Sequence, residues 1–151
     1  MELKAWLRKI PEVVLNNLIP KVYIIAGPTA VGKTAVAMAL AQRLGTMIVS
    51  ADSRQCYAEM SVGTAKPTRA ELEQVHHYFV NAFPVSRVLS AADYEVLALQ
   101  YLNEIFTRSN YAVVCGGTGL YIKALCEGLD AMPEADMAIV SEAEAAYKEY
   151  G

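Results

Sequence analysis

The chain has 151 residues, of which 54% are hydrophobic and 19% charged, and its formal net charge is -3. This composition excludes a disordered chain, which would be poorer in apolar residues, and the length suits one globular domain. The small negative charge does not by itself favour a nucleic-acid-binding surface, since such surfaces usually carry an excess of lysine and arginine.

The cysteines and the N-terminus bear on the cellular compartment. Cys56, Cys115 and Cys126 are odd in number and form no Cys-x-x-Cys pair, so we interpret them as structural residues of a protein in a reducing cytoplasm. No apolar run is long enough to span a membrane. The N-terminus mixes charges with apolar residues and lacks the pattern of a signal peptide. We therefore expect a cytoplasmic protein with no membrane partner.

The first predicted elements are helices and strands around a glycine-rich loop. Apolar residues recur every three to four positions over 2–18, which predicts an amphipathic helix, interrupted at Pro11, that packs on the domain. A partner-binding helix is the alternative interpretation. Residues 22–26 are apolar on both faces and predict a buried parallel strand. A helix is predicted over 34–44, with Gly45 as its C-cap.

The middle of the chain is less regular. Residues 47–49 predict a second buried strand, 54–68 a loop, 69–75 a short helix and 77–81 a third strand. A serine three residues before an aspartate then indicates a helix N-cap, and the helix that Ser90 begins runs to about Thr107.

The last elements repeat the same alternation. Residues 111–115 predict another buried strand, a helix follows from Leu120 to Gly128, and an alanine- and glutamate-rich helix begins after Met132. Strands that alternate with helices in this way indicate a parallel sheet covered by helices on both faces.

The most specific motif is Gly27-x-x-x-x-Gly32-Lys33-Thr34, which lies between a predicted strand and a predicted helix. In this context the pattern predicts a phosphate-binding loop: backbone N–H groups and the helix N-terminus bind an anion, the lysine adds charge, and the threonine hydroxyl holds Mg²⁺. The predicted fold class is therefore α/β: a P-loop NTPase-like parallel sheet with helices on both faces, in a three-layer αβα arrangement. The motif leaves kinases, NTPases and diphosphate-using transferases open.

Two further sites follow predicted strands. Asp52 lies after the second strand, at the edge where ligands bind in open parallel sheets, although it could equally cap a turn. Residues 116–119, Gly-Gly-Thr-Gly, follow the last strand, where a plain turn is the likelier interpretation on local grounds. His76 and His77 point to opposite faces of a strand, so we expect no metal site there.

Together these motifs resemble one family, the tRNA dimethylallyltransferases, over about residues 22–130. The matching stretches follow the family's order: Gly27-Pro28-Thr29-Ala30-Val31-Gly32-Lys33-Thr34, Asp52-Ser53-Arg54-Gln55-Cys56-Tyr57, Val62-Gly63-Thr64-Ala65-Lys66-Pro67, Ser90-Ala91-Ala92-Asp93-Tyr94 and Gly116-Gly117-Thr118-Gly119-Leu120-Tyr121. The second and third stretches look like the tRNA-modifying branch rather than the relatives that prenylate free adenine nucleotides.

The resemblance implies transfer of a dimethylallyl group from dimethylallyl diphosphate to the exocyclic amine of the adenine 3′-adjacent to the tRNA anticodon. It implies that Asp52 is the general base, that Thr118 assists it, and that tRNA is contacted by Asp52, Ser53, Arg54, Gln55, Lys66 and Thr118. The diphosphate would be held by Gly27, Pro28, Thr29, Ala30, Val31, Gly32, Lys33 and Thr34, with Mg²⁺ on Thr34.

Family members are about twice as long, so the resemblance also implies a truncated chain. Its parts would be an N-terminal helical extension (1–21), the P-loop catalytic core (22–130) and the start of a helical insertion domain (131–151). We expect a monomer that binds the tRNA anticodon stem-loop when complete, and a fragment that folds but is inactive alone. The alternatives are a P-loop small-molecule kinase and a non-catalytic nucleotide-binding module.

Overall fold

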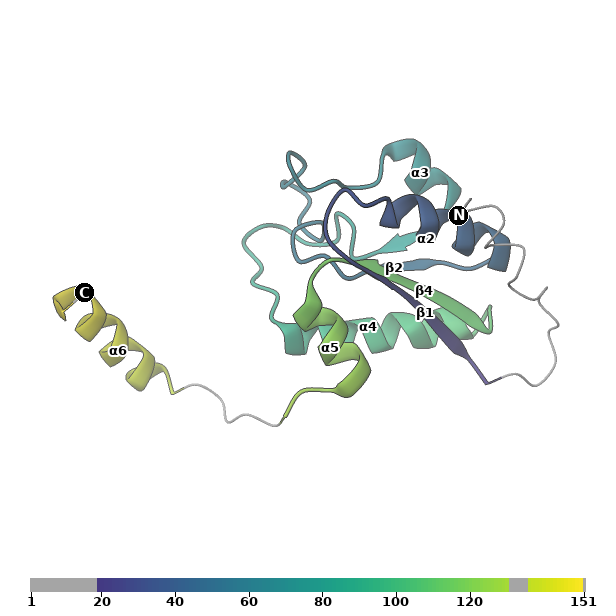
Figure 1. The fold of residues 1–151 in the computed structure, drawn as a ribbon. Helices are drawn as coiled ribbons and strands as arrows, with labels where there is room; N and C mark the ends of the chain where they lie inside the picture. Colours follow the sequence, from purple (N-terminus) through teal and green to yellow (C-terminus); the bar gives the residue numbers. More distant parts are fainter. Residues whose placement is uncertain (1–18, 131–135, 151) are drawn as a thin grey trace.

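A four-stranded parallel sheet forms the centre of the computed structural model, which describes residues 19–130 and 136–150 (Figure 1). The strand order is β1-β4-β2-β3. The strands are β1 (Lys21–Ala26), β2 (Ile48–Ser50), β3 (His77–Tyr78) and β4 (Tyr111–Gly116). Because β4 pairs with both β1 and β2, the last strand of the described residues lies between the first two of them. The predicted parallel sheet is confirmed.

Helices cover both faces of this sheet, which confirms the predicted three-layer arrangement. The helices are α2 (Lys33–Leu44), α3 (Arg69–Gln74), α4 (Ala91–Phe106), α5 (Gly119–Glu127) and α6 (Met137–Tyr150). Helix α2 lies on one face, and α4 and α5 lie on the other (Figure 1). No residue of α6 is buried. The helix predicted over 2–18 lies outside the described residues.

Strand β4 divides its side chains between the two faces, because neighbouring residues of a strand point in opposite directions. Tyr111 and Val113 pack with α2, whereas Ala112 and Val114 pack with α4 and α5. All four are buried. The doubly covered strand is the reason that this part of the sequence is apolar without alternation.

Aromatic side chains hold α4 and α5 together beneath the sheet. The rings of Tyr94 and Tyr121 stack with their centroids 4.2 Å apart and their planes 11° from parallel. The Tyr121 hydroxyl donates a hydrogen bond to the Leu89 carbonyl oxygen at 3.1 Å. These contacts fix the start of α5, where Thr118 lies, relative to the rest of the domain.

Residues 22–26 form a strand as predicted, but the prediction that this strand is buried is wrong. Strand β1 forms, but Val22 is 37% and Ile24 39% exposed, while Tyr23 and Ile25 are half-buried beside α2. The reason is position: β1 is an edge strand among the described residues, and none of its residues belongs to the core cluster that α4 and α5 form on the face of Val22 and Ile24.

The third strand is shorter than predicted. It ends at Tyr78, and Phe79 and Asn81 then take left-handed backbone angles, with φ of 62° and 54°. Left-handed residues cannot continue a strand, so the chain turns here. The segment that follows lies against residues 55–58 through hydrogen bonds from Asn81, Ala82 and Phe83.

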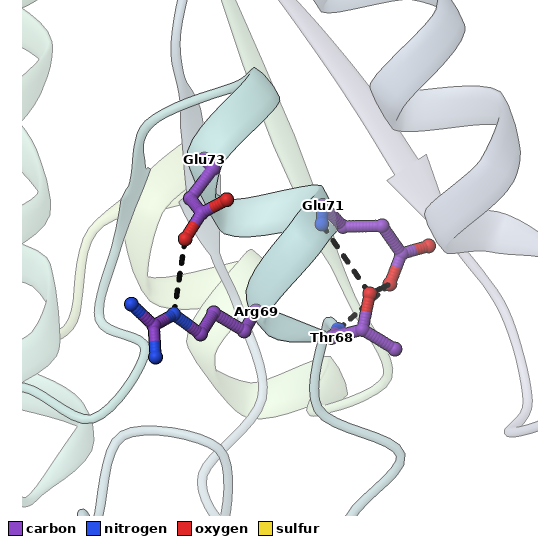
Figure 2. A network of polar contacts seen from close by, with 4 residues as sticks. All are labelled: Thr68, Arg69, Glu71 and Glu73. Carbon is purple, nitrogen blue, oxygen red and sulfur yellow. Dashed lines mark hydrogen bonds and ion pairs between the residues drawn. The ribbon is translucent and has the colours of Figure 1, made fainter.

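Reciprocal hydrogen bonds cap the helices on either side of this turn. Helix α4 begins with the predicted box of Ser90 and Asp93. Helix α3 begins with an equivalent box, which Figure 2 shows: the Thr68 hydroxyl accepts from the Glu71 N–H, and the Glu71 carboxylate accepts from the Thr68 N–H. Each box satisfies helix-end N–H groups that would otherwise lack partners. Among the described residues, no helix is long and apolar enough to cross a membrane.

Candidate functional site

Three parallel strands end at the same edge of the sheet, and each is followed by a predicted site residue. Ala26 pairs with Gly116, and Ser50 pairs with Cys115. The predicted phosphate-binding loop after β1, Asp52 after β2 and Thr118 after β4 therefore start from neighbouring positions. In open parallel sheets this carboxyl edge is where ligands bind.

The loop predicted to bind phosphate contains three residues with positive φ. Gly27 and Gly32 have φ angles of 154° and 86°, and Ala30 is also left-handed at 67°. Gly32 is the N-cap of α2 and provides no side-chain acceptor for the first helical N–H groups. Those groups have no partner within a helix, so they are available to an anion, and the helix N-terminus adds favourable partial charge.

The charged group of the loop is held close to its backbone. The Lys33 ammonium group donates a hydrogen bond to the Pro28 carbonyl oxygen at 2.6 Å. Lys33 and Thr34 line a cavity of about 310 Å³, which we call the loop cavity. It is lined by Thr29, Ala30, Gly32, Lys33, Thr34, Asp52, Gln55, Ala65, Cys115 and Gly116. Of the predicted diphosphate-binding residues, Gly27, Pro28 and Val31 do not line it, and Pro28 lines the neighbouring cavity described next.

A second cavity, the Thr118 cavity, adjoins the first. Its volume is about 400 Å³, and it is lined by Pro28, Thr29, Asp52, Ser53, Arg54, Gly63, Thr64, Gly117 and Thr118. Asp52 and Thr29 line both cavities. The carboxylate predicted to act as a base therefore lies between the phosphate-binding loop and a second space large enough for part of another substrate.

The Asp52 carboxylate is held by the backbone that follows it. Its Oδ1 accepts hydrogen bonds from the N–H groups of Arg54 at 2.9 Å and Gln55 at 3.3 Å. Both bonds use the same oxygen, so within the described part of the chain Oδ2 has no hydrogen bond to protein. Asp52 can therefore both cap a turn and face a ligand. One carboxylate oxygen accepts the hydrogen bonds of the turn, and the other can contact a ligand.

Thr118 contacts the same segment rather than its own helix. It is the N-cap of α5 but makes no side-chain cap. Its hydroxyl oxygen instead accepts a hydrogen bond from the Ser53 N–H at 2.9 Å and lies 3.3 Å from the Ser53 hydroxyl oxygen. The structure therefore brings Asp52, Ser53 and Thr118 together.

The remaining predicted tRNA-binding residues differ in position. Arg54 is exposed and lines the Thr118 cavity. Gln55 lines the loop cavity, and its side-chain amide donates to the carbonyl oxygens of Thr64 and Ala65. Lys66 lines neither cavity, and its ammonium group bonds to Tyr57, Ala58 and Asn81.

Three lining residues were not singled out from the sequence: Gly63, Thr64 and Ala65. They belong to the Gly-Thr-Ala-Lys-Pro stretch, where only the lysine had been given a role. The signal was Gly63, because glycine lets a backbone approach a ligand closely.

The other reactive side chains near the site are protonated or buried. Burial raises the pKa of Cys115 to about 11 and also raises the pKa of the Cys56 thiol, so neither is a thiolate near neutral pH. Burial lowers the pKa of His77, whose Nδ1 lies 2.8 Å from the Val75 carbonyl oxygen. Residues 19–130 and 136–150 contain no group of three or more His, Cys, Asp or Glu side chains arranged to hold a metal.

Comparison with known proteins identifies the family. Residues 55–151 match the model of the IPP transferase family. The chain belongs to this family. It is 50% identical over 115 residues to a tRNA dimethylallyltransferase of Cytophaga hutchinsonii, covering 76% of this chain and 38% of the relative. It is 44% identical over 117 residues to tRNA dimethylallyltransferase 1 of Bacteroides thetaiotaomicron, covering 78% and 38%.

Solved structures of the family have the same fold. The tRNA isopentenylpyrophosphate transferase of Bacillus halodurans matches with a TM-score of 0.71 and 38% identity, over 87% of this chain and 44% of that protein. A eukaryotic dimethylallyltransferase acting on tRNA matches with a TM-score of 0.70 and 25% identity, over 83% and 32%. The chain spans about two fifths of the length of the curated relatives it matches. The family match favours a prenyltransferase over the alternative small-molecule kinase.

Proposed function

We propose that a polypeptide of family length carrying these residues transfers a dimethylallyl group from dimethylallyl diphosphate to an adenine of tRNA. The acceptor is the exocyclic amine of the adenine 3′-adjacent to the anticodon. The observation that carries the proposal is the position of Asp52, which lines both the loop cavity and the Thr118 cavity. A carboxylate between an anion-binding loop and a second cavity suits a reaction that joins a diphosphate substrate to a nucleophile.

The loop cavity is the proposed site of the donor diphosphate. The N–H groups at the start of α2 and the Lys33 ammonium group supply positive charge on one side of it. Diphosphate would replace the Pro28 carbonyl oxygen as the partner of Lys33, because a charged acceptor makes the stronger hydrogen bond. Charge that develops on the leaving diphosphate is then stabilised by groups already in place.

The Thr118 cavity is the proposed site of the adenine. An adenine within an RNA stack must be extruded before an enzyme can act on it, and the cavity at Asp52 and Thr118 would receive the extruded base. The bond from the exocyclic nitrogen to the allylic carbon forms as the carbon–oxygen bond to diphosphate breaks, and Asp52 accepts the proton that the nitrogen loses. General base catalysis of this kind contributes about 10²–10⁴-fold.

The residues fit a magnesium ion. Thr34 lines the loop cavity beside Lys33, and its hydroxyl would serve as an oxygen ligand there. Mg²⁺ is usually held by one or two protein oxygens together with substrate phosphates and waters, so the absence of a multi-residue metal cluster from the described residues is consistent with it. When bound, Mg²⁺ would neutralise part of the diphosphate charge.

The partners follow from the same proposal. The tRNA anticodon stem-loop would lie over the Thr118 cavity, with Ser53 and Arg54 beside the extruded base. A protein that modifies tRNA in bacteria works in the cytoplasm, and we propose that it does so as a monomer. The chain's net charge is -3, and we propose that the rest of a family-length polypeptide contributes a basic surface for RNA.

The test uses a family-length chimera, in which residues 19–130 of this chain replace the matching segment of the C. hutchinsonii relative. The chimera is incubated with tRNA and labelled dimethylallyl diphosphate, and in parallel with labelled ATP. Label from the prenyl group should enter tRNA, and none should be transferred from ATP. Transfer of phosphate from ATP, or no transfer of prenyl groups by a folded chimera, would contradict the proposal. The unmodified chain serves as the second protein in each assay, and we expect it to be inactive.

A further inference from the structure

The ammonium group of Lys66 is fully engaged within the protein. It donates hydrogen bonds to the Tyr57 carbonyl oxygen at 2.5 Å and the Asn81 side-chain oxygen at 2.8 Å, and it lies 3.4 Å from the Ala58 carbonyl oxygen. A lysine has three N–H donors and no acceptor. Each donor therefore already has an acceptor, and a contact with an RNA phosphate would require one of these bonds to break.

Two of these acceptors belong to the segment 52–58, which begins with the proposed base. Further along this segment, the carbonyl oxygen of Gln55 accepts from the Asn81 N–H at 3.0 Å, and that of Cys56 accepts from Ala82 and Phe83 at 2.9 and 3.0 Å. Segment 52–58 thus lies along the turn that follows β3. Lys66 connects the two, because it contacts the end of the segment and Asn81 at once.

A second connection runs in the opposite direction. The Gln55 side chain donates to the carbonyl oxygens of Thr64 and Ala65, at 3.2 and 3.1 Å. Segment 52–58 thus uses a side chain to hold the backbone of 64–65, while Lys66 uses its side chain to hold the backbone at 57–58. Ala65 and Asn81 are both left-handed, with φ of 48° and 54°, so the turns themselves need external support.

We propose that Lys66 is a positioning residue: its ammonium group joins segment 52–58 to Asn81 and thereby fixes Asp52, Ser53 and Arg54 at the Thr118 cavity, without contacting tRNA. The effect of Lys66 on catalysis rests on the proposed function. The structural role of Lys66, which is to join the two segments, does not. It differs from the assignment of Lys66 to tRNA binding, which the resemblance implied.

The structural part is tested on the chain itself by amide hydrogen exchange. In Lys66→Met, the amides of Ala58, Asn81 and Ala82 should exchange at least about tenfold faster, while the amides of β4 keep their protection. Asn81→Ala should accelerate the same amides. Lys123→Met, which removes an exposed lysine from α5, is the control and should change none of them. Unchanged exchange in Lys66→Met would overturn the proposal, whatever the chimera's activity.

The catalytic part is tested in the chimera with the Lys66→Arg variant. Arginine keeps the charge but presents a planar fork that cannot meet three converging acceptors. As a positioning residue, Lys66→Arg should lower the single-turnover rate at saturating tRNA about as much as Lys66→Met, by about tenfold or more, and the salt dependence of tRNA binding should not change. If Lys66 instead binds a phosphate, Lys66→Met should reduce the salt slope by about 1 and Lys66→Arg should restore it. That result would overturn the proposal.

The Asn81→Ala variant also distinguishes positioning by Lys66 from phosphate binding by Lys66. Lys66 and Asn81 act through one contact, so the double variant should react no more slowly than Lys66→Met alone. Full additivity of the two rate losses would mean that Lys66 acts elsewhere, and would also overturn the proposal. If the parent chimera does not prenylate tRNA, the proposed function fails while the exchange experiment still decides the role of Lys66.

Discussion

Gly116 and Ala51 meet backbone to backbone at the edge of the sheet. A Cβ atom added to Gly116 would lie 2.1 Å from the Ala51 carbonyl oxygen. The same region is tied by hydrogen bonds from the Ala51 N–H to the Cys115 carbonyl oxygen and from the Thr118 N–H to the Ala51 carbonyl oxygen, at 2.8 and 3.0 Å. This close approach holds Asp52 beside the residues that follow β4.

Gly116→Ala should therefore destabilise the domain and displace Asp52. The new methyl group overlaps backbone atoms that no side-chain rotation can move, and overpacking of this kind costs about 1–3 kcal/mol or more. Chemical denaturation of the chain measures the loss. Gly119→Ala is the matched control, because a Cβ there meets nothing within 4 Å, and its unfolding free energy should change by less than about 1 kcal/mol. Equal effects of the two substitutions would contradict the packing argument.

Thr118→Val should weaken the contact with Ser53 while preserving the shape of the side chain. The Ser53 N–H would lose its acceptor, at a cost of about 1 kcal/mol in unfolding free energy, and the chimera's single-turnover rate should fall. Thr118→Ser keeps the hydroxyl and should retain both stability and rate. If the valine and serine variants behave alike, the hydroxyl is not the group that matters.

Asp52→Asn should remove the base and keep the turn. The asparagine side-chain oxygen can still accept from Arg54 and Gln55, so the backbone is preserved. The amide cannot take a proton, and we expect the chimera's single-turnover rate to fall at least about 10²-fold while diphosphate binding survives. Rapid-quench measurement of labelled tRNA gives the rate, and equilibrium binding of diphosphate gives the control. A rate close to that of the parent would exclude Asp52 as the base.

Tyr94→Phe and Tyr121→Phe should differ in their effects on stability. The Tyr94 hydroxyl is buried and has no hydrogen-bond partner in the described part of the chain, so its removal should leave stability unchanged or raise it by up to about 1 kcal/mol. Tyr121→Phe deletes the bond to the Leu89 carbonyl oxygen and should cost about 1 kcal/mol. Thermal and chemical unfolding of the two variants, which make the same chemical change in stacked rings, provide the comparison. A larger loss for Tyr94→Phe would mean that its hydroxyl has a partner.

His77 should make the domain less stable in mild acid. Burial lowers its folded pKa below the ordinary 6.5, so the unfolded chain binds the proton more readily. The stability that comes from keeping this ring neutral is complete above about pH 6.5 and is lost as the pH falls toward the folded pKa.

Denaturation between pH 7 and pH 5 measures this effect, since the carboxylates of Glu71 and Asp93, whose pKa values are lowered, titrate below that range. His77→Asn should flatten the pH dependence of the unfolding free energy. His76→Asn changes an exposed neighbour and should preserve most of that pH dependence. If the unfolding free energy of His77→Asn still depends steeply on pH, another group is responsible.

The sequence alone determined where most of the helices and strands lie. Apolar runs and glycine positions predicted the strands, the helices and the C-cap at Gly45, because these depend on local backbone preference and on side-chain periodicity. Ser90 and Asp93 likewise predicted the start of α4, since a capping box lies within four consecutive residues.

Only the tertiary structure decided which strand lies at the edge and where Lys66 points. Local pattern cannot distinguish an edge strand from a central one, so Val22 and Ile24 were expected to be buried although β1 pairs only with β4 among the described residues. The approach of Asp52 to Thr118 depends on β4 inserting between β1 and β2. Such contacts join residues far apart in the sequence, and their geometry arises from the packing of the whole sheet.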